Sequence, residues 1–299
     1  MYSMKTVCIY GKGGLGDTLK GYFWTGQEDE GLFDDGWQYV EAIKKSHPEV
    51  VIKYIAMSAN QYSAEFYRHH PCIDEVVQGE WLDPRVPDDG AKIRKYLGDA
   101  VLLSQFGFKG LKPKRQNKLY LGPDDLQMIG KISALGKYVV VHPFSGGEKR
   151  MVMPIQGYVP IIRRLVHILG VPVVVIGGNY TKKLNKPVHK CDSFDHGVDG
   201  MVNLVNQTNL RVAAQIILNA MCTVSVRSFS CALSKSGLTK SVVLVSSKSY
   251  MSKKETINSI KSMGWEEHVI DKNMRIIDVG KSCNEKIIDG VLDLCKKTH

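Results

Sequence analysis

The chain has 299 residues, 43% hydrophobic and 23% charged, which is long enough for two domain cores and typical of a globular protein. No apolar run approaches the roughly 20 residues that cross a bilayer, so a membrane-spanning protein is not expected. The net charge of +10 is uneven, because residues 1–122 hold 16 basic and 16 acidic residues while residues 123–299 hold 24 and 14. The basic second half favours an anionic ligand such as a nucleotide, an anionic lipid or DNA, and a generally solvated basic surface is the alternative.

The N-terminal sequence MYSMKTVCIYG has a strand pattern and no signal-peptide pattern, so a cytoplasmic location is expected. The seven cysteines are scattered and show no C-x-x-C spacing. Neither a zinc site nor a disulfide framework is predicted from them.

A glycine-rich loop follows the first predicted strand, Lys5–Tyr10. Three glycines have the dinucleotide-binding spacing G-x-G-x-x-G, namely Gly11, Gly13 and Gly16. Residues 12–18 also differ from a variant P-loop motif, K-G-G-x-G-K-[ST], at a single position. Asp17 stands there in place of the required lysine and would repel phosphates. The pattern is less typical of a nicotinamide-dinucleotide site, because the acidic residue expected after the second strand is not cleanly placed. The second strand begins late, at Val50. Asp17 is interpreted either as a helix N-cap or as a general base that faces a cleft.

The rest of the first half alternates strands with helices. Strands are predicted at Val50–Met57, Ile73–Val77 and Asp99–Leu103, and helices at about Trp37–Lys45 and near Tyr62–His69. Such alternation predicts βαβ units with a parallel sheet. The run Phe108–Lys118 holds five cations and no acid, and it is interpreted as a solvated loop or as an anion-binding edge.

A second glycine loop occurs in the stretch KYVVVHPFSGGEKR, residues 137–150. Lys137–Val141 has the β-branched pattern of a buried parallel strand, and the chain then enters a loop that contains Ser145, Gly146 and Lys149. A hydroxyl donor, a flexible backbone and a cation together suit an anionic group such as a diphosphate. An ordinary strand-to-helix connection with solvated charges is the alternative.

The second half repeats the alternating plan. Further strands are predicted at Val171–Ile176, Met201–Leu204, Thr223–Val226 and Ser241–Val245, and helices at Gln156–Leu169, Leu210–Ala220, 228–237 and from about Asn284. Five strands with intervening helices predict a second doubly wound unit, in which Gly177 and Gly178 form a flexible turn after one strand. The predicted domains are residues 1–122 and 137–299, joined by a linker helix at 123–136.

The order of these weak motifs resembles the heptosyltransferase-like family, glycosyltransferase family 9. The family's Gly-Asp pair is matched by Gly16-Asp17, and its N-P-x-I-D-E-V segment by His70–Val76. Its H/N-P-G-A/S loop with a following lysine is matched by residues 142–149, and its Gly-Gly turn by Gly177-Gly178. Its N-L-x-G-x-T-x-L segment is followed by Asn203–Leu210 except at the glycine. The resemblance implies an α/β protein with two doubly wound Rossmann-like domains facing a cleft, the GT-B fold.

Three departures accompany this resemblance. Where the family carries D-[ST]-G-x-x-H, residues 226–233 read VRSFSCAL, without the Asp or the His. The family's K-x-W-P is loosened to KRMVMP at residues 149–154, and the acidic loop Gly26–Gly36 interrupts a helix that is usually continuous. These departures concern the sugar and the acceptor more than the fold.

The implied activity is transfer of a sugar from a nucleotide-diphosphate sugar to an acceptor hydroxyl, by inversion and without a metal or another cofactor. Asp17 is the expected base. The expected donor-binding residues are Ser145, Gly146, Lys149, Gly177, Gly178, Arg227, Ser228 and Ser230. The expected acceptor-side residues are Lys12, Gly13, Gly14 and Gly16.

The expected acceptor is a saccharide or glycolipid, and the inner membrane surface is a further location where a basic protein could work. A viral-type DNA glycosyltransferase is the alternative, with Phe108–Lys118 on the phosphates and a base flipped toward Asp17. A non-catalytic nucleotide-sugar-binding protein is the second alternative, because the D-[ST]-G-x-x-H signature is missing.

Overall fold

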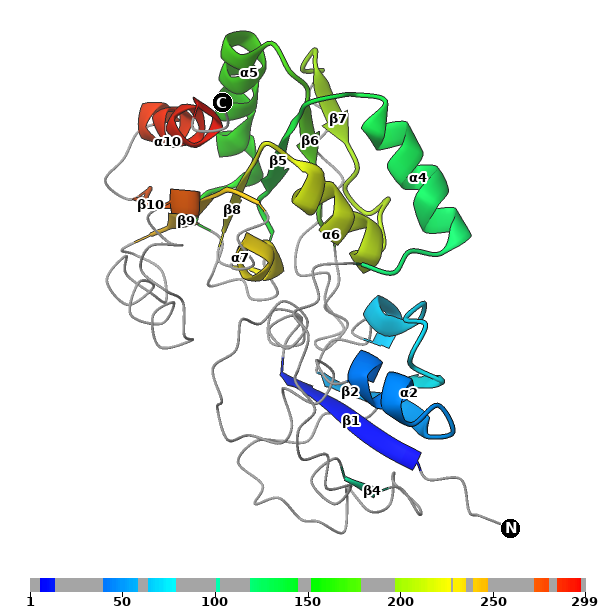
Figure 1. Ribbon diagram of the computed structural model, residues 1–299. Helices are drawn as coiled ribbons and strands as arrows, with labels where there is room; N and C mark the ends of the chain where they lie inside the picture. Colours follow the sequence, from blue (N-terminus) through cyan, green and yellow to red (C-terminus); the bar gives the residue numbers. More distant parts are fainter. Residues whose placement is uncertain are drawn as a thin grey trace. The chain divides into compact units, whose positions relative to one another are not determined.

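The computed structural model describes residues 6–13, 40–58, 64–78, 101–102, 119–144, 152–178, 197–226, 228–234, 239–246, 272–279 and 284–296, with the backbone alone at some of them. The chain divides into two compact units, Met1–Tyr120 and Leu121–His299 (Figure 1). Each unit has its own parallel sheet. The α/β class predicted from the sequence is confirmed.

The sheet of unit 1 has the order β3-β2-β1-β4. Its strands are β1 Thr6–Gly13, β2 Val51–Ser58, β3 Glu75–Gln78 and β4 Val101–Leu102, and its helices are α2 Val40–Ser46 and the 3-10 helix η2 Ala64–Tyr67. The helix predicted near Tyr62–His69 is thus a short 3-10 turn. The nearby Pro71 disfavours helical backbone at His70, so the chain turns there and enters β3.

The described core of unit 1 contains buried residues of α2, η2 and β2, and η2 packs on β2. Val40 and Ile43 of α2 and Ile52 of β2 are fully or almost fully buried. The ring of Tyr54 on β2 lies 4.1 Å from the ring of Tyr67 on η2. Aromatic rings of this size bury much apolar surface, so a single 3-10 turn is enough to cover this part of the sheet.

The sheet of unit 2 has the order β10-β9-β8-β5-β6-β7. Its strands are β5 Val139–His142, β6 Val173–Val175, β7 Met201–Asn203, β8 Cys222–Val226, β9 Ser241–Val245 and β10 Met274–Asp278. Its helices are α4 Pro123–Ser133, the 3-10 turn η5 Ile155–Gly157, α5 Tyr158–Leu169, α6 Leu210–Asn219, α7 Phe229–Ser234 and α10 Asn284–Lys296.

β10 is a sixth strand that the sequence did not reveal, so the predicted count of five was wrong. Among the described strands it pairs with β9 alone, at the edge of the sheet, and four of its five residues are partly exposed. An edge strand needs fewer apolar residues than a central one, so its sequence MRIID lacks the continuous β-branched run that marks β5, β6 and β9.

Both sheets are wound outward from a central strand. In unit 2 the chain starts at β5, moves through β6 to β7, and then returns to the other side of β5 to form β8, β9 and β10. This is the strand order 3-2-1-4-5-6 of a dinucleotide-binding Rossmann sheet, and the order in unit 1 matches its first four strands. In each unit the winding direction reverses beside the first strand.

The two faces of the unit 2 sheet are covered by different helices (Figure 1). Alternate residues of the central strands, among them Val141 and Val224, belong to one buried cluster with α5 and α10. The other face is covered by α6 and α7, and α4 packs on α6. Because α6 lies between the sheet and α4, seven of its residues are buried, more than one face of a helix provides.

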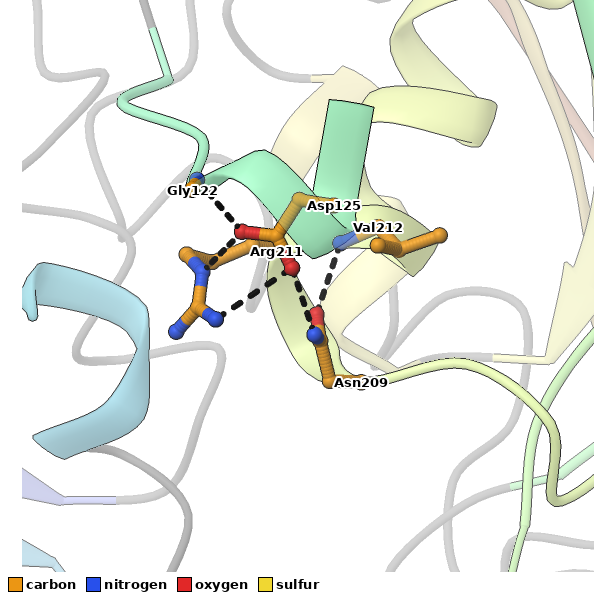
Figure 2. Close-up of polar contacts among 5 residues, drawn as sticks. All are labelled: Gly122, Asp125, Asn209, Arg211 and Val212. Carbon is orange, nitrogen blue, oxygen red and sulfur yellow. Dashed lines mark hydrogen bonds and ion pairs between the residues drawn. The ribbon is translucent and has the colours of Figure 1, made fainter. Parts of the chain in front are cut away.

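The predicted linker at 123–136 contains α4, a helix that is built into unit 2. Its Asp125 side chain is 1% exposed and accepts hydrogen bonds from Arg211 Nε at 2.6 Å and Asn209 Nδ2 at 2.6 Å (Figure 2). The same carboxylate accepts the backbone N–H of Gly122 at 2.9 Å, which caps α4. Asn209 Oδ1 in turn caps α6 by accepting the N–H of Val212. One carboxylate therefore joins the first turns of both helices.

Candidate functional site

The most informative edge of unit 2 is the one where β5 and β8 end. In an open doubly wound sheet, ligands bind at the carboxyl ends of the strands, beside the point where the winding reverses. That point lies between β5 and β8 here, and the last paired residues of the two strands are His142 and Ser225. Residues that follow these two strands are therefore the first candidates for ligand contacts.

Three polar side chains meet at this edge. His142 Nδ1 lies 3.0 Å from Ser228 Oγ and 3.1 Å from Ser230 Oγ, and the two serine oxygens lie 2.8 Å apart. All three distances are within hydrogen-bond range. Because His142 belongs to β5 while the serines follow β8, the cluster forms only when these strands pair. We call these three residues the hydroxyl cluster.

The hydroxyl cluster is buried on one side and accessible on the other. His142 is 6% exposed and Ser230 is fully buried, whereas Ser228 is partly exposed. The ring of Phe229 meets the imidazole edge to face, at 5.4 Å between centroids. Burial lowers the pKa of His142 to about 4, so the imidazole is neutral at physiological pH. The cluster thus offers neutral hydrogen-bonding groups beside a route to solvent through Ser228.

A further hydroxyl lies next to this cluster. Ser225 is the register partner of His142 and therefore points to the same face of the sheet. It is fully buried, and its Oγ has no hydrogen-bond partner in the described part of the chain. This edge of the sheet is polar although the strands that lead to it are apolar. The arrangement can donate hydrogen bonds to a ligand oxygen without contributing a charge.

The structure brings together two of the predicted donor-binding residues, Ser228 and Ser230, and adds His142 to them. His142 lies in one of the sequence motifs but was not among the predicted site residues. One signal could have found it: a histidine that ends the apolar run VVVH points to the carboxyl edge of a buried strand. Its serine partners lie 86 and 88 positions away, so no local pattern connects them.

Two other predicted donor-binding residues, Gly177 and Gly178, follow β6 next to the same edge. Gly177 has a φ of 129°, and a Cβ added to it would lie 2.2 Å from Cδ2 of Phe144. Both observations require a glycine for reasons of packing and backbone conformation. A contact between these glycines and a ligand remains a prediction.

The remaining predicted site residues are only partly covered by the structure. Lys12 and Gly13 are the last two residues of β1, so their backbone lies at the carboxyl edge of the unit 1 sheet. The others lie outside the described residues: Gly14, Gly16, Asp17, Ser145, Gly146, Lys149 and Arg227. The cationic run Phe108–Lys118 and the acidic loop Gly26–Gly36 also lie outside them. Their roles stay predictions.

The motif His70–Val76 has a structural role at the opposite edge of unit 1. Asp74 Oδ2 accepts the N–H of Ile52 at 2.6 Å and pairs with Lys44 Nζ at 2.8 Å. The N–H of Asp74 donates to the carbonyl of Ile52 at 2.9 Å. These contacts hold the start of β3 against the start of β2. This part of the motif therefore aligns strands at their amino ends, away from the carboxyl edge where ligands bind.

Within the parts of the chain that the structure describes, no group of three or more His, Cys, Asp or Glu side chains could hold a metal ion. Among the same residues, no helix is both long and apolar enough to cross a bilayer.

The chain resembles solved structures along its whole length. A glycosyl transferase family 9 structure from Veillonella parvula matches it with a TM-score of 0.57 and 12% identity, and the match covers 98% of each of the two chains. For E. coli ADP-heptose LPS heptosyltransferase II, the TM-score is 0.54 at 12% identity, with 98% and 99% of the two chains covered. For E. coli heptosyltransferase WaaC with ADP-2-deoxy-2-fluoro heptose, it is 0.52 at 10% identity, with 98% and 100% covered.

No protein-family model and no curated protein matches the chain. At identities this low the structural likeness shows the fold, which is that of the family 9 glycosyltransferase structures. The expected α/β fold with parallel sheets, of the type found in GT-B heptosyltransferase structures, is therefore confirmed.

Proposed function

We propose that this protein is a glycosyltransferase that moves a sugar from a nucleotide-diphosphate sugar to an acceptor hydroxyl. The observation that carries the proposal is the hydroxyl cluster of His142, Ser228 and Ser230 at the switch point of a Rossmann sheet. A ligand at that point meets hydroxyl donors, which can bind phosphate oxygens. The likeness to heptosyltransferase structures over 98% of the chain supports the same function.

Unit 2 would hold the donor. In the described structure Ser228 supplies an accessible hydroxyl that is backed by the buried Ser230, and the sequence adds Ser145, Gly146, Lys149 and Arg227 as diphosphate contacts. The excess of basic residues in 123–299, 24 against 14 acidic, favours an anionic donor. The E. coli structures are of an ADP-heptose heptosyltransferase and of WaaC with an ADP-sugar analogue, so an ADP-activated heptose is the first donor to test.

The reaction needs one proton acceptor and stabilisation of one leaving group. Asp17 would take the proton of the acceptor hydroxyl as its oxygen attacks the anomeric carbon, and the bond from that carbon to the diphosphate oxygen would break. The electron pair of that bond leaves with the nucleoside diphosphate, whose added charge Lys149 and the hydroxyl cluster would stabilise. A single displacement of this kind inverts the anomeric centre. Cations and hydroxyls would do this without a metal.

The acceptor that we propose is a saccharide or a glycolipid. A basic protein can act at an anionic membrane surface, so we place it in the cytoplasm with access to the inner leaflet. Unit 1 would receive the acceptor, with Lys12, Gly13, Gly14 and Gly16 near its hydroxyl and Asp17 as the base.

The direct test is turnover with a panel of nucleotide sugars, with ADP-heptose among them, detected as released nucleoside diphosphate and as mass added to a saccharide acceptor. Ser228→Ala should weaken donor binding and slow transfer, while Ser234→Ala at the end of the following helix α7 should not, because Ser234 Oγ donates to the carbonyl of Ser230. The altered D-[ST]-G-x-x-H region favours one alternative, a non-catalytic nucleotide-sugar-binding protein. Binding of a donor without any transfer or hydrolysis would support that alternative.

A further inference from the structure

The three atoms of the hydroxyl cluster form a closed triangle, and the number of protons in it decides what it can offer a ligand. Each side of the triangle is short enough for a hydrogen bond, at 3.0, 3.1 and 2.8 Å. The two serines contribute one proton each. His142 is neutral, because burial lowers its pKa to about 4, so it carries a single ring proton on either Nδ1 or Nε2.

If the ring proton is on Nε2, Nδ1 is a hydrogen-bond acceptor. One serine hydroxyl then donates to Nδ1 and the other donates to the first serine, so both hydroxyl protons are used inside the triangle. Turning the Ser228 proton toward a ligand would break one of these two bonds, and with both bonds kept the ligand meets only oxygen lone pairs. An anionic oxygen is repelled by such a surface.

If the ring proton is on Nδ1, the hydrogen bonds of the cluster run in the opposite direction. Nδ1–H donates to the serine oxygens, which lie at almost equal distances of 3.0 and 3.1 Å. Ser230 then donates to Ser228, and the proton of Ser228 is left to point out of the triangle. Ser228 is also the accessible member of the pair, since Ser230 is fully buried. This tautomer presents a hydroxyl donor to an anion.

We propose that His142 is a positioning residue whose Nδ1–H tautomer turns the Ser228 hydroxyl outward as the donor to a diphosphate oxygen. The inference rests on the proposed function, because it takes the diphosphate of a nucleotide sugar as the ligand. His142 itself does not touch the diphosphate. It acts through the two serines, and anion binding and the Nδ1–H tautomer stabilise each other.

The test uses the full-length protein and inorganic pyrophosphate as the probe. The ¹⁵N chemical shifts of the histidine ring nitrogens distinguish a protonated from an unprotonated nitrogen. The His142 signal is identified, among the nine histidines, as the one missing from His142→Asn. With pyrophosphate bound, Nδ1 of His142 should carry the proton. An Nε2–H tautomer in the complex, or no pyrophosphate binding by calorimetry, would overturn the inference.

Three variants and one control variant separate positioning from folding. Ser228→Ala should weaken pyrophosphate binding about ten- to one-hundredfold, as expected for a hydrogen bond to a charged group. In His142→Asn the amide nitrogen can take the place of Nδ1–H, so binding should survive, whereas the longer amide of His142→Gln cannot and binding should fall as in Ser228→Ala. Ser234→Ala is the matched control, and its affinity should equal that of the unaltered protein. Thermal unfolding confirms that each variant is folded before its affinity is compared.

The outcomes also distinguish this inference from the proposed function. Pyrophosphate binding with the Nδ1–H tautomer, but no transfer from any nucleotide sugar, would uphold the inference about the cluster and remove the proposed activity. Sugar transfer that is unaffected by Ser228→Ala would uphold the proposed activity and remove the inference about the cluster.

Discussion

Asp125 and Arg211 lie 86 positions apart in the chain and form a buried ion pair, with Nε of the arginine 2.6 Å from Oδ2 of the aspartate. The second carboxylate oxygen accepts a longer bond from the guanidinium, at 3.3 Å, which makes the pair two-pronged (Figure 2). Burial opposes ionisation of Asp125. The hydrogen bonds from Arg211 and Asn209 outweigh it, so the pKa of this carboxyl lies below its ordinary value. The pair joins α4 to α6 within unit 2.

Removing one partner of this pair should strongly destabilise unit 2. Asp125→Ala removes the carboxylate that pairs with the buried guanidinium of Arg211 and leaves the N–H of Gly122 without its acceptor, which should cost about 3 to 5 kcal/mol in chemical unfolding. The double variant Asp125→Leu with Arg211→Met should lose less stability than Asp125→Ala alone, because neither charge of the pair stays buried. The exposed neighbour Asp124→Asn is the control and should change stability by less than about 1 kcal/mol. A double variant whose loss of stability equals the summed losses of Asp125→Leu alone and Arg211→Met alone would contradict this account.

The buried imidazole of His142 should make the stability of the protein depend on pH. Its pKa is about 4 in the folded chain and close to 6.5 when unfolded, so between these values the unfolded state binds a proton that the folded state does not. The free energy of unfolding should therefore fall as the pH drops from about 6.5 to 4, by ~3 kcal/mol at most from this group. The measurement is urea unfolding across this range for the unaltered protein and for His142→Asn. Their difference should shrink toward low pH, and a constant difference would count against a neutral buried histidine.

Gly177 should not tolerate a side chain. Gly177→Ala places a Cβ 2.2 Å from the ring of Phe144 and keeps a φ of 129°, which together should cost about 2 kcal/mol or more. Gly136→Ala is the matched control, since Gly136 also has a positive φ, 71°, but open space around its Cα, and it should cost about 1 kcal/mol. Phe144→Leu combined with Gly177→Ala should recover part of the loss. Equal melting temperatures for the two glycine variants would show that the contact with Phe144 does not matter.

The role proposed for Asp17 is testable by a single substitution. Asp17→Asn should reduce sugar transfer by a factor on the order of 10² or more, because the amide cannot accept the acceptor's proton. Donor binding, measured by calorimetry, should stay close to that of the unaltered protein. If Asp17 is a helix N-cap, Asn replaces it well and the transfer rate should not change. That result would withdraw the base assignment.

Binding to duplex DNA distinguishes a DNA acceptor from a saccharide or glycolipid acceptor. A saccharide-specific enzyme should show no tight binding to duplex DNA at low salt. A DNA-modifying enzyme should bind tightly there and lose affinity steeply as salt rises, because phosphate contacts release counterions. Fluorescence anisotropy across a salt series measures this directly. Steep salt-dependent binding that weakens when Lys112, Lys114 and Arg115 are neutralised would replace the saccharide proposal with the DNA alternative.

The sequence by itself located most of the secondary structure of the described regions. β9 was predicted with its observed bounds, Ser241–Val245, and β5 and β6 within two residues at each end. Strands buried on both faces of a parallel sheet need continuous β-branched runs, and a sequence shows such runs directly. The edge strand β10 and the 3-10 turn η2 do not carry that signal. The structure was therefore needed to find β10 and to show that the helix predicted near Tyr62–His69 is a 3-10 turn.

The sequence also placed Ser228 and Ser230 among the candidate site residues, because they occupy the position of a known motif. Only the tertiary structure joined them to His142, and only it paired Asp125 with Arg211. The reason is physical: local propensity acts over a few residues, whereas these partners lie 84 to 88 positions apart. Their contacts arise from the crossover that places β8 beside β5 and from the packing of α4 on α6.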